Sequence, residues 1–305
     1  MYMKKFIMIA VLLLLAGTIP VSIYFIEYPH SFDVNTASLP SRSLSLLEQQ
    51  AQALAGLAVK PLYMMLSLLV ILALIGQKRT AILALQWGQI AFLTGEVFCA
   101  INFYVYRHES ILSEYLHSYG MAVAFAFTSF AVLEGLEMRL GSRIRSWVQD
   151  EARAWMKFIL PMLVALCFIP ILTTIQPESY AVTIFRFPYS YTRLDVYQLY
   201  ERRILPALAL TTFAGAYLSL MKKNETLSFA TKTLLCAGIG ALGFSFFRVA
   251  LNAMFADALV WFEFWEEATE LMFVGAVAFV LWRYRRILLE KTPILDLIKQ
   301  TSEAS

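Results

Sequence analysis

The sequence predicts an all-α, polytopic integral membrane protein, and two observations lead to this fold class. Of its 305 residues, 59% are hydrophobic and only 15% are charged, with a mean hydropathy of +0.64. A soluble domain of this length carries about 25% charged residues. The apolar residues are also grouped into stretches of about 18 or more, the length that an α-helix needs to cross a bilayer. Together these features indicate a helical bundle in lipid.

Eight such stretches follow one another along the chain. We expect them at about residues 6–26, 57–76, 81–105, 113–136, 157–175, 204–221, 233–255 and 260–282. The first resembles a secretory signal because Lys4 and Lys5 precede it, but its apolar residues continue to Ile26, which favours a retained anchor. Residues 1–291 are therefore expected to form one transmembrane domain, and residues 292–305 a short cytoplasmic tail.

Positive charge predicts how these helices are oriented, because cytoplasmic loops are enriched in Lys and Arg. One set of helix ends carries 17 basic residues: Lys4, Lys5, Lys78, Arg79, Arg139, Arg143, Arg145, Arg153, Lys157, Lys222, Lys223, Lys232, Arg283, Arg285, Arg286, Lys291 and Lys299. The other set carries 6: Arg42, Arg107, Arg186, Arg193, Arg202 and Arg203. An even number of spans then places both termini in the cytoplasm. We expect the inner (plasma) membrane of a bacterium.

Two segments on the predicted external side are long. Residues 27–56 contain Ser45-x-x-Glu48, a capping-box pattern that predicts a short helix leading into the second span. Residues 176–203 are rich in Tyr and Phe. These aromatic residues predict either an interfacial belt or a docking surface for an extracytoplasmic protein partner.

Several ionisable residues lie where lipid would otherwise surround the chain, and such residues usually face a partner or a cavity. They are Glu96 in the third span, Glu114 and His117 in the fourth, Arg248 in the seventh, and Glu263, Glu266, Glu267 and Glu270 in the eighth. The four glutamates of the eighth span recur at helical spacing and so share one face. At 1.5 Å per residue, the main groups lie roughly 10–15 Å below the external helix ends. They are expected to meet in one layer.

Glu114-x-x-His117 has the spacing with which a helix offers a carboxylate and an imidazole to one metal ion, as in di-iron bundles. We predict Glu96, Glu114, His117, Glu267 and Glu270 as metal ligands, and Arg248 and Glu266 as catalytic residues. A ligand set of carboxylates with one imidazole suits iron or manganese better than zinc. The alternative interpretation is a buried ion-pair network in which Arg248 neutralises one of the glutamates.

Other functions are not supported by the sequence. The three cysteines form no CxxC or CxxCH motif, so neither a zinc ribbon nor haem c is expected. Gly238-x-Gly240-x-x-Gly243 has the letters of a dinucleotide fingerprint but lies in a predicted span, where close helix packing explains it and no nucleotide is expected. The net charge of +3 gives no reason to expect nucleic acid.

Three functions stay open. The first is a metal-dependent membrane enzyme, an oxidoreductase rather than a hydrolase. The second is a cation- or proton-coupled transporter that uses the same acids. The third is a non-catalytic membrane subunit that docks an external protein partner through residues 176–203. Membrane lipids are expected to contact the protein in all three cases.

Overall fold

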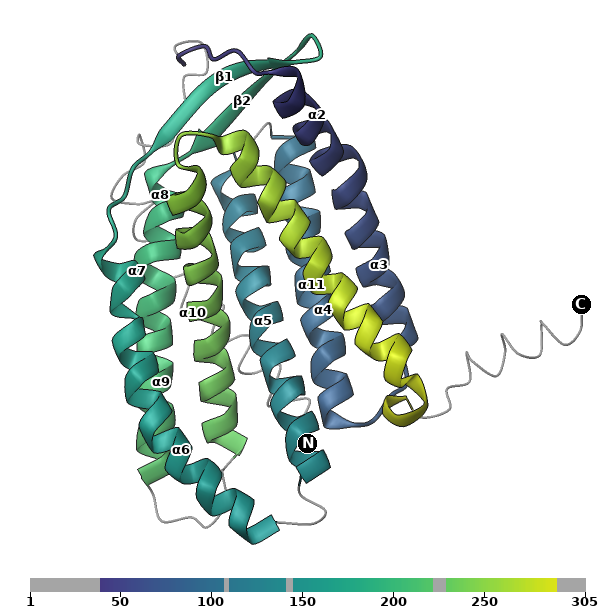
Figure 1. Cartoon of the computed structure of the whole chain (residues 1–305), viewed down its shortest axis with the longest axis vertical. Helices are drawn as coiled ribbons and strands as arrows, with labels where there is room; N and C mark the ends of the chain where they lie inside the picture. Colours follow the sequence, from purple (N-terminus) through teal and green to yellow (C-terminus); the bar gives the residue numbers. More distant parts are fainter. Residues whose placement is uncertain (1–38, 107–109, 141–144, 222–228, 290–305) are drawn as a thin grey trace, which may run out of the picture.

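The computed structural model describes residues 39–106, 110–140, 145–221 and 229–289, and these form a bundle of long helices capped at one end by a β-hairpin (Figure 1). The predicted first span, residues 6–26, and the predicted tail, residues 292–305, lie outside the described residues. Six helical segments are long and apolar enough to cross a membrane: Leu46–Ala73, Thr80–Asn102, Ile111–Leu136, Ala154–Leu172, Asp195–Met221 and Phe229–Phe255. The prediction of a membrane-type helical bundle is therefore confirmed at this level.

The first described span begins earlier than the sequence predicted. Helix α2 (Leu46–Leu54), the π-helical turn η2 (Ala55–Val59) and α3 (Lys60–Ala73) follow one another without a break. Ser45 caps α2, and Glu48 closes a capping box with it, as the sequence predicted. After the turn at Gly76, where φ is +82°, the chain enters α4 (Thr80–Tyr104) and then α5 (Ile111–Leu140).

The second half of the bundle contains the predicted fifth to eighth spans. Helix α6 (Arg145–Leu166) is followed by α7 (Phe168–Leu172), and the break at Cys167 lies three residues before Pro170. Helix α8 (Asp195–Leu199), the π-helical turn η3 (Tyr200–Ile204) and α9 (Leu205–Met221) form one continuous span. Then come α10 (Phe229–Phe255) and α11 (Leu259–Leu288). Helix α11 is not among the six apolar segments, since glutamates in its first half and arginines near its end interrupt the apolar residues, although it packs against α3 and α10.

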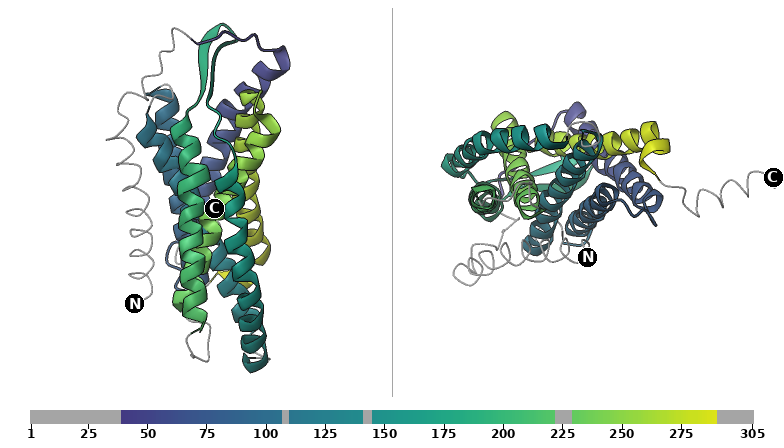
Figure 2. Two further views of the ribbon diagram at one scale, coloured as in Figure 1. Left: turned by 90° about the vertical axis from the view of Figure 1, so that its left-hand side faces the viewer. Right: turned by 90° about the horizontal axis from the view of Figure 1, so that it is seen from below.

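The hairpin is a departure from the predicted all-α fold. Strands β1 (Glu178–Ile184) and β2 (Phe187–Arg193) pair in antiparallel fashion, with Glu178 opposite Arg193. They lie across the bundle end formed by α2 and the start of α11 (Figure 1; Figure 2, left). Tyr180 and Tyr191 are buried in a cluster with residues of α10 and α11, including Leu259 and Phe262. Part of the aromatic segment expected to form a belt or docking surface therefore packs inward as a lid.

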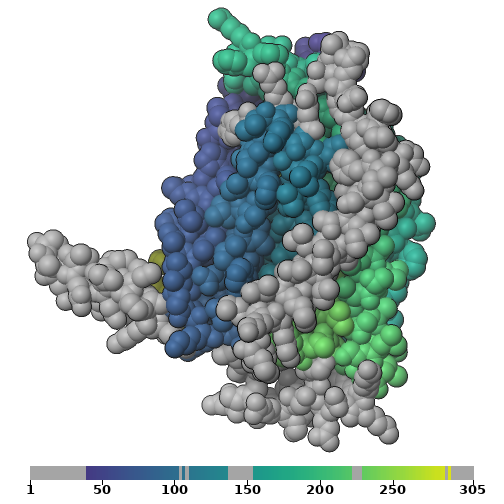
Figure 3. Space-filling model, turned by 180° about the vertical axis from the view of Figure 1, so that it is seen from behind, coloured from purple at the N-terminus to yellow at the C-terminus, as the bar shows by residue number. Residues whose placement is uncertain are grey.

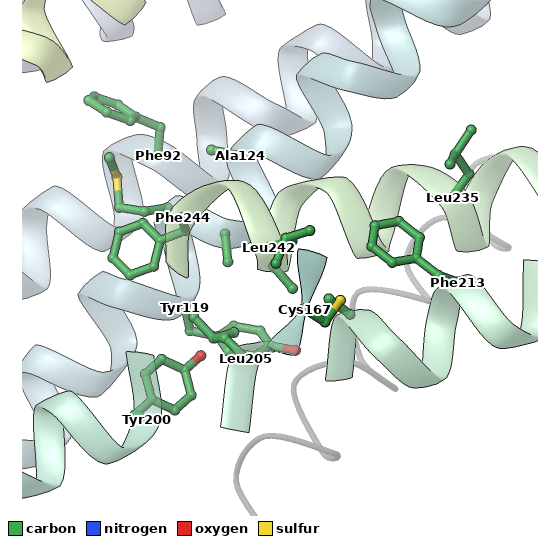
Figure 4. Close-up of a cluster of buried hydrophobic side chains, with 14 of the residues drawn as sticks. Phe92, Tyr119, Ala124, Cys167, Tyr200, Leu205, Phe213, Leu235, Leu242 and Phe244 are labelled. Atoms are coloured by element: carbon green, nitrogen blue, oxygen red, sulfur yellow. The ribbon is translucent and has the colours of Figure 1, made fainter. Parts of the chain in front are cut away.

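The apolar core runs between α5, α9 and α10, and it joins the two halves of the bundle. Phe213, Leu242 and Phe244 are buried there, and Tyr119, Tyr200 and Leu205 belong to the same cluster (Figure 4). Gly240 lets α10 touch α5, because a Cβ at this position would lie 2.4 Å from the carbonyl oxygen of Ala122. This close contact supports the packing interpretation of the glycine pattern.

On the face that is turned away from the viewer in Figure 1, α3, α4 and α5 (purple to blue) form a continuous surface (Figure 3). Helix α5 packs against α4 and α10, and α11 packs against α3 and α10; Figure 2 (right) shows the helices end on, from the side away from the hairpin. Among the ionisable residues predicted from the sequence, Glu96, His117, Arg248 and Glu270 are buried.

Candidate functional site

Two glycines bring the backbones of α4 and α5 together at the site. A Cβ at Gly120 would lie 2.8 Å from the carbonyl oxygen of Ala91 and 2.9 Å from Cα of Gly95. The residues beside this contact are Glu96, directly after Gly95, and His117, one turn before Gly120. His117 Nδ1 consequently lies 3.1 Å from Glu96 Oε1. The backbone contact between the two helices thus sets the geometry of the first pair of site residues.

Lys60 forms the centre of one group of polar side chains. It is 7% exposed, and its Nζ lies 2.8 Å from Glu96 Oε2 and 2.8 Å from Glu267 Oε1. The hydroxyl of Tyr63 contacts the same two carboxylates, at 2.6 Å from Glu267 Oε2 and at shorter range from Glu96. Lys60 Nζ also lies 3.3 Å from Cys99 Sγ. Helices α3, α4 and α11 are therefore linked through one ammonium group.

Arg248 of α10 forms the centre of a second group. Its Nε donates to Glu201 Oε1 at 2.5 Å, its Nη1 contacts Glu266, and its Nη2 lies 3.9 Å from Glu114 Oε1. Glu201 is 1% exposed and also accepts from Arg193 Nη2 at 3.1 Å. One buried carboxylate is thus shared by two guanidinium groups, one from the bundle and one from the hairpin.

Both π-helical turns of the described chain border this site. The turn Ala55–Val59 ends directly before Lys60, and the turn Tyr200–Ile204 contains Glu201. An extra residue in a helical turn shifts the face of every side chain that follows, and such turns are frequent at functional sites. The two turns therefore help to direct Lys60 and Glu201 into the bundle.

His117 connects the two groups. Its Nε2 lies 3.6 Å from Glu266 Oε1, on the Arg248 side, while Nδ1 faces Glu96 on the Lys60 side. Glu270, which is 3% exposed, completes the cluster. Ligand atoms of His117, Glu266 and Glu270 lie within 4.8 Å of one another, and so do those of Glu96, Glu267 and Glu270. This arrangement could hold a metal ion between α4, α5 and α11.

Three buried atoms in the cluster lack a well-aligned hydrogen bond: Glu96 Oε1 and His117 Nδ1, which form an ion pair with each other, and Glu270 Oε2. Most buried polar side-chain atoms are paired, so each exception needs an explanation. The 3.1 Å between the first two is also close to the separation of neighbouring ligands on one ion, about 3 Å for bonds of about 2.1 Å. The two groups that share Glu270, one with His117 and Glu266 and the other with Glu96 and Glu267, could each offer carboxylate oxygens to a metal ion, and the first adds an imidazole nitrogen.

Carboxyl groups outnumber basic groups in this part of the described chain. The carboxyl groups belong to Glu96, Glu114, Glu201, Glu263, Glu266, Glu267 and Glu270, and the Lys and Arg groups in contact with them to Lys60, Arg193 and Arg248. Like charges this close in a low-dielectric interior must be protonated or must meet a cation. The site therefore requires additional positive charge, as protons or as a metal ion.

A cavity of about 100 Å³ connects the cluster with the underside of the hairpin. Thr192 and Arg193 of β2 line it from above. The bundle contributes Lys60, His117, Arg248, Glu266 and Glu267 to its wall, together with Gln52 and Tyr197. A molecule in this space would touch both the hairpin and the carboxylate cluster.

The structure brings most of the sequence-predicted residues together. Glu96, His117, Glu267 and Glu270 lie in the groups described above, and Glu266, predicted as catalytic, lies in one of them. Among the described residues, no such group includes Glu114, whose carboxylate instead lies toward Arg248. The Glu114-x-x-His117 spacing therefore does not direct both side chains to one point.

Sequence reasoning missed four contributors. Lys60 lies within the predicted second span but carries no predicted role, and Tyr63 lies one turn after it on the same face. Cys99 lies one turn after Glu96, so its place in a group with Glu96 and His117 follows from helical spacing. Glu201 gave no signal, because its helix begins at Asp195 and the predicted span began only at residue 204.

Comparison of the chain with protein families, with characterised proteins and with solved structures finds no match. Fold and site define a class: a bundle whose described residues include six helices of membrane-spanning length and composition, with a carboxylate-rich interior at one end.

Proposed function

We propose that this protein is a polytopic membrane enzyme that binds a divalent metal ion between α4, α5 and α11. The observation that carries the proposal is the convergence of two groups of ligand atoms that share Glu270, one with His117 and Glu266 and the other with Glu96 and Glu267, each within 4.8 Å. A bound cation would satisfy these atoms and would offset the surplus of carboxylates. Glu266 and Glu267 are close enough to complete the ligand set.

The donor types favour particular metals and one kind of chemistry. Carboxylates with one imidazole suit iron or manganese, whereas zinc sites are richer in Cys and His. Both metals can change oxidation state, so we propose an oxidoreductase in preference to a hydrolase. The cavity under the hairpin would admit the substrate.

Arg248 is proposed as a positioning residue in this scheme. Its guanidinium contacts Glu266 and donates to Glu201, which fixes the Glu266 carboxylate beside His117. Lys60 and Tyr63 would hold Glu267 and Glu96 in the same way. Residues that hydrogen-bond to metal ligands keep those ligands oriented. Removing such a residue typically weakens metal binding by 10- to 100-fold.

We further propose eight spans with both termini in the cytoplasm of a bacterium and the site in the outer half of its inner membrane. The helix ends opposite the hairpin carry basic residues such as Lys78, Lys232 and Arg285. Cytoplasmic enrichment of Lys and Arg then assigns the hairpin to the external side.

One observation favours a second candidate, a proton- or cation-coupled transporter. Lys60 lies between two carboxylates that Tyr63 also contacts, which is an arrangement able to share protons. Transport, however, requires access from both faces. The cluster lies in the hairpin half of the bundle, so the enzyme is the better supported proposal.

Melting curves of the purified protein with and without a strong chelator test the proposal. Binding to the folded state adds stability that disappears when the metal is removed. The chelator should lower the melting temperature of the parent and of Glu134→Gln, whose carboxylate pairs with Lys232 away from the site. It should hardly affect His117→Ala. A parent curve indifferent to the chelator, with Arg248→Ala as the most damaging substitution, would favour the proton-sharing network instead.

A further inference from the structure

The cavity wall contains unpaired hydrogen-bonding groups that the metal cluster does not use. Arg193 is 5% exposed, and although its Nη2 donates to Glu201, its Nε and Nη1 have no partner. The hydroxyl of Tyr197 and Oε1 of Gln52 are also buried and unpaired, and both residues line the same cavity. A buried guanidinium with two unused nitrogens is costly unless a ligand accepts from them.

Positive charge is concentrated around Arg193. Its guanidinium and that of Arg248 both lie over the ring of Phe262, at 4.3 and 4.8 Å, and both donate to the single carboxylate of Glu201. Burial, and then the nearby guanidinium groups of Arg248 and Arg202, lower the pKa of Arg193 to about 10 despite the presence of Glu201. Arg248 is also paired with Glu266, so the two free nitrogens of Arg193 are the cationic donors left for an anion at the hairpin end of the cavity.

The size of the cavity limits the ligand. A single water needs about 10–15 Å³ of such space, so about 100 Å³ holds a small molecule or a headgroup. Arg193 ends strand β2, where pairing with Glu178 fixes its backbone. The donors are thus held by the hairpin, opposite the cluster on the bundle.

We propose that Arg193 and Tyr197 bind the carboxylate or phosphate group of a small anionic substrate, so that the rest of the molecule points toward the carboxylate cluster. That this anion is a substrate rests on the proposed enzyme function. Binding of the anion itself requires only the hairpin end of the cavity.

Isothermal titration with inorganic phosphate and with butyrate tests the proposal on the detergent-solubilised full chain. Tyr197→Phe removes only a hydroxyl that has no partner within the protein, so folding is preserved. Tyr119→Phe is the matched control, because its hydroxyl is equally buried and unpaired but does not line the cavity. We expect at least one probe to bind the parent, with affinity reduced about threefold to tenfold in Tyr197→Phe, the range of one hydrogen bond, and unchanged in Tyr119→Phe.

Arg193→Lys keeps a positive charge beside Glu201 but removes the guanidinium, and it should weaken binding of that probe at least as much as Tyr197→Phe. Mass spectrometry of co-purified lipids distinguishes the source of the anion. An anionic phospholipid retained by the parent and lost in Arg193→Lys would identify a headgroup, whereas free probes binding to delipidated protein would identify a soluble anion. The proposal would be overturned if the parent bound neither phosphate nor butyrate and retained no anionic phospholipid. Equal losses of affinity in Tyr197→Phe and Tyr119→Phe would also overturn it.

Repeating the titration after chelation separates this inference from the metal proposal. Anion binding that survives in protein shown to bind no metal would leave the anion site intact while removing the proposed enzyme function. Stoichiometric metal without anion binding would overturn only the anion site.

Discussion

His117 Nδ1 and Glu96 Oε1 lie 3.1 Å apart as an ion pair, and neither atom has any other partner among the described residues. The contact exists because α4 and α5 touch through Gly95 and Gly120, which leaves the two side chains little freedom to separate. An imidazole nitrogen facing a carboxylate oxygen in this way is a natural pair of metal ligands. The predictions below test the packing, charge and topology that support this pair.

Replacing Gly120 with alanine should damage both the fold and the site. The added Cβ would meet the backbone of α4 at 2.8–2.9 Å, and overpacking of this kind costs about 1–3 kcal/mol. Gly243→Ala in α10 is the matched control, because a Cβ there has no neighbour within 4 Å. Thermal melting should show a clear loss for Gly120→Ala only. Equal melting temperatures for the two variants would contradict the role assigned to the helix contact.

Tyr180 should anchor the hairpin to the start of α11. Its hydroxyl accepts from the backbone N–H of Leu259 at 3.0 Å, and an N–H at the first turn of a helix has no partner within the helix. Tyr180→Phe should cost about 1–3 kcal/mol, because the N–H is left buried and unpaired. Tyr191→Phe removes a buried hydroxyl that has no partner, so it should be neutral. Urea or heat denaturation of both variants measures the difference, and a larger loss for Tyr191→Phe would refute this role.

Arg248 should be among the most sensitive residues for stability. Removing one partner of a buried ion pair costs roughly 3–5 kcal/mol, because the other charges stay buried without compensation. Arg248→Gln leaves the carboxylates of Glu201 and Glu266 without this cationic partner. Lys232→Gln, which breaks the more accessible pair with Glu134, should cost much less. The free energies of unfolding compare the two, and similar losses would mean that Arg248 is not a central partner.

The arrangement in the membrane can be tested with reporter fusions. A reporter after Glu290 should be cytoplasmic, and one near Ser190 in strand β2 should be external, because 17 basic residues lie on one predicted side and 6 on the other. A C-terminal reporter on the external side would invert the orientation and remove the site from the outer half of the membrane.

The helices could be predicted because long apolar stretches carry their own signal, and the ends of most described spans agree with the sequence to within a few residues, although α11 continues to Leu288. The hairpin could not. Its turn residues Phe185 and Arg186 have φ values of 45° and 77°, a conformation that usually requires Asn or Gly. A Phe-Arg turn gives no hairpin signal, so the segment looked like an aromatic loop.

The site was predictable only in part, for a related reason. Glu96, His117 and Glu270 stand out because charge inside a span is rare. Glu201 does not, since its helix begins before the apolar stretch does. The π-helical turn at Ala55–Val59 also changes which face Lys60 presents, and no local sequence pattern announces such a turn.

Elemental analysis of the purified parent protein, set against His117→Ala and Glu270→Gln, tests the central claim most directly. We predict close to one equivalent of iron or manganese in the parent and in the Glu134→Gln control, and a loss of metal in both site variants. A folded parent that binds no iron, manganese, zinc or copper, even after incubation with each metal, would contradict the account.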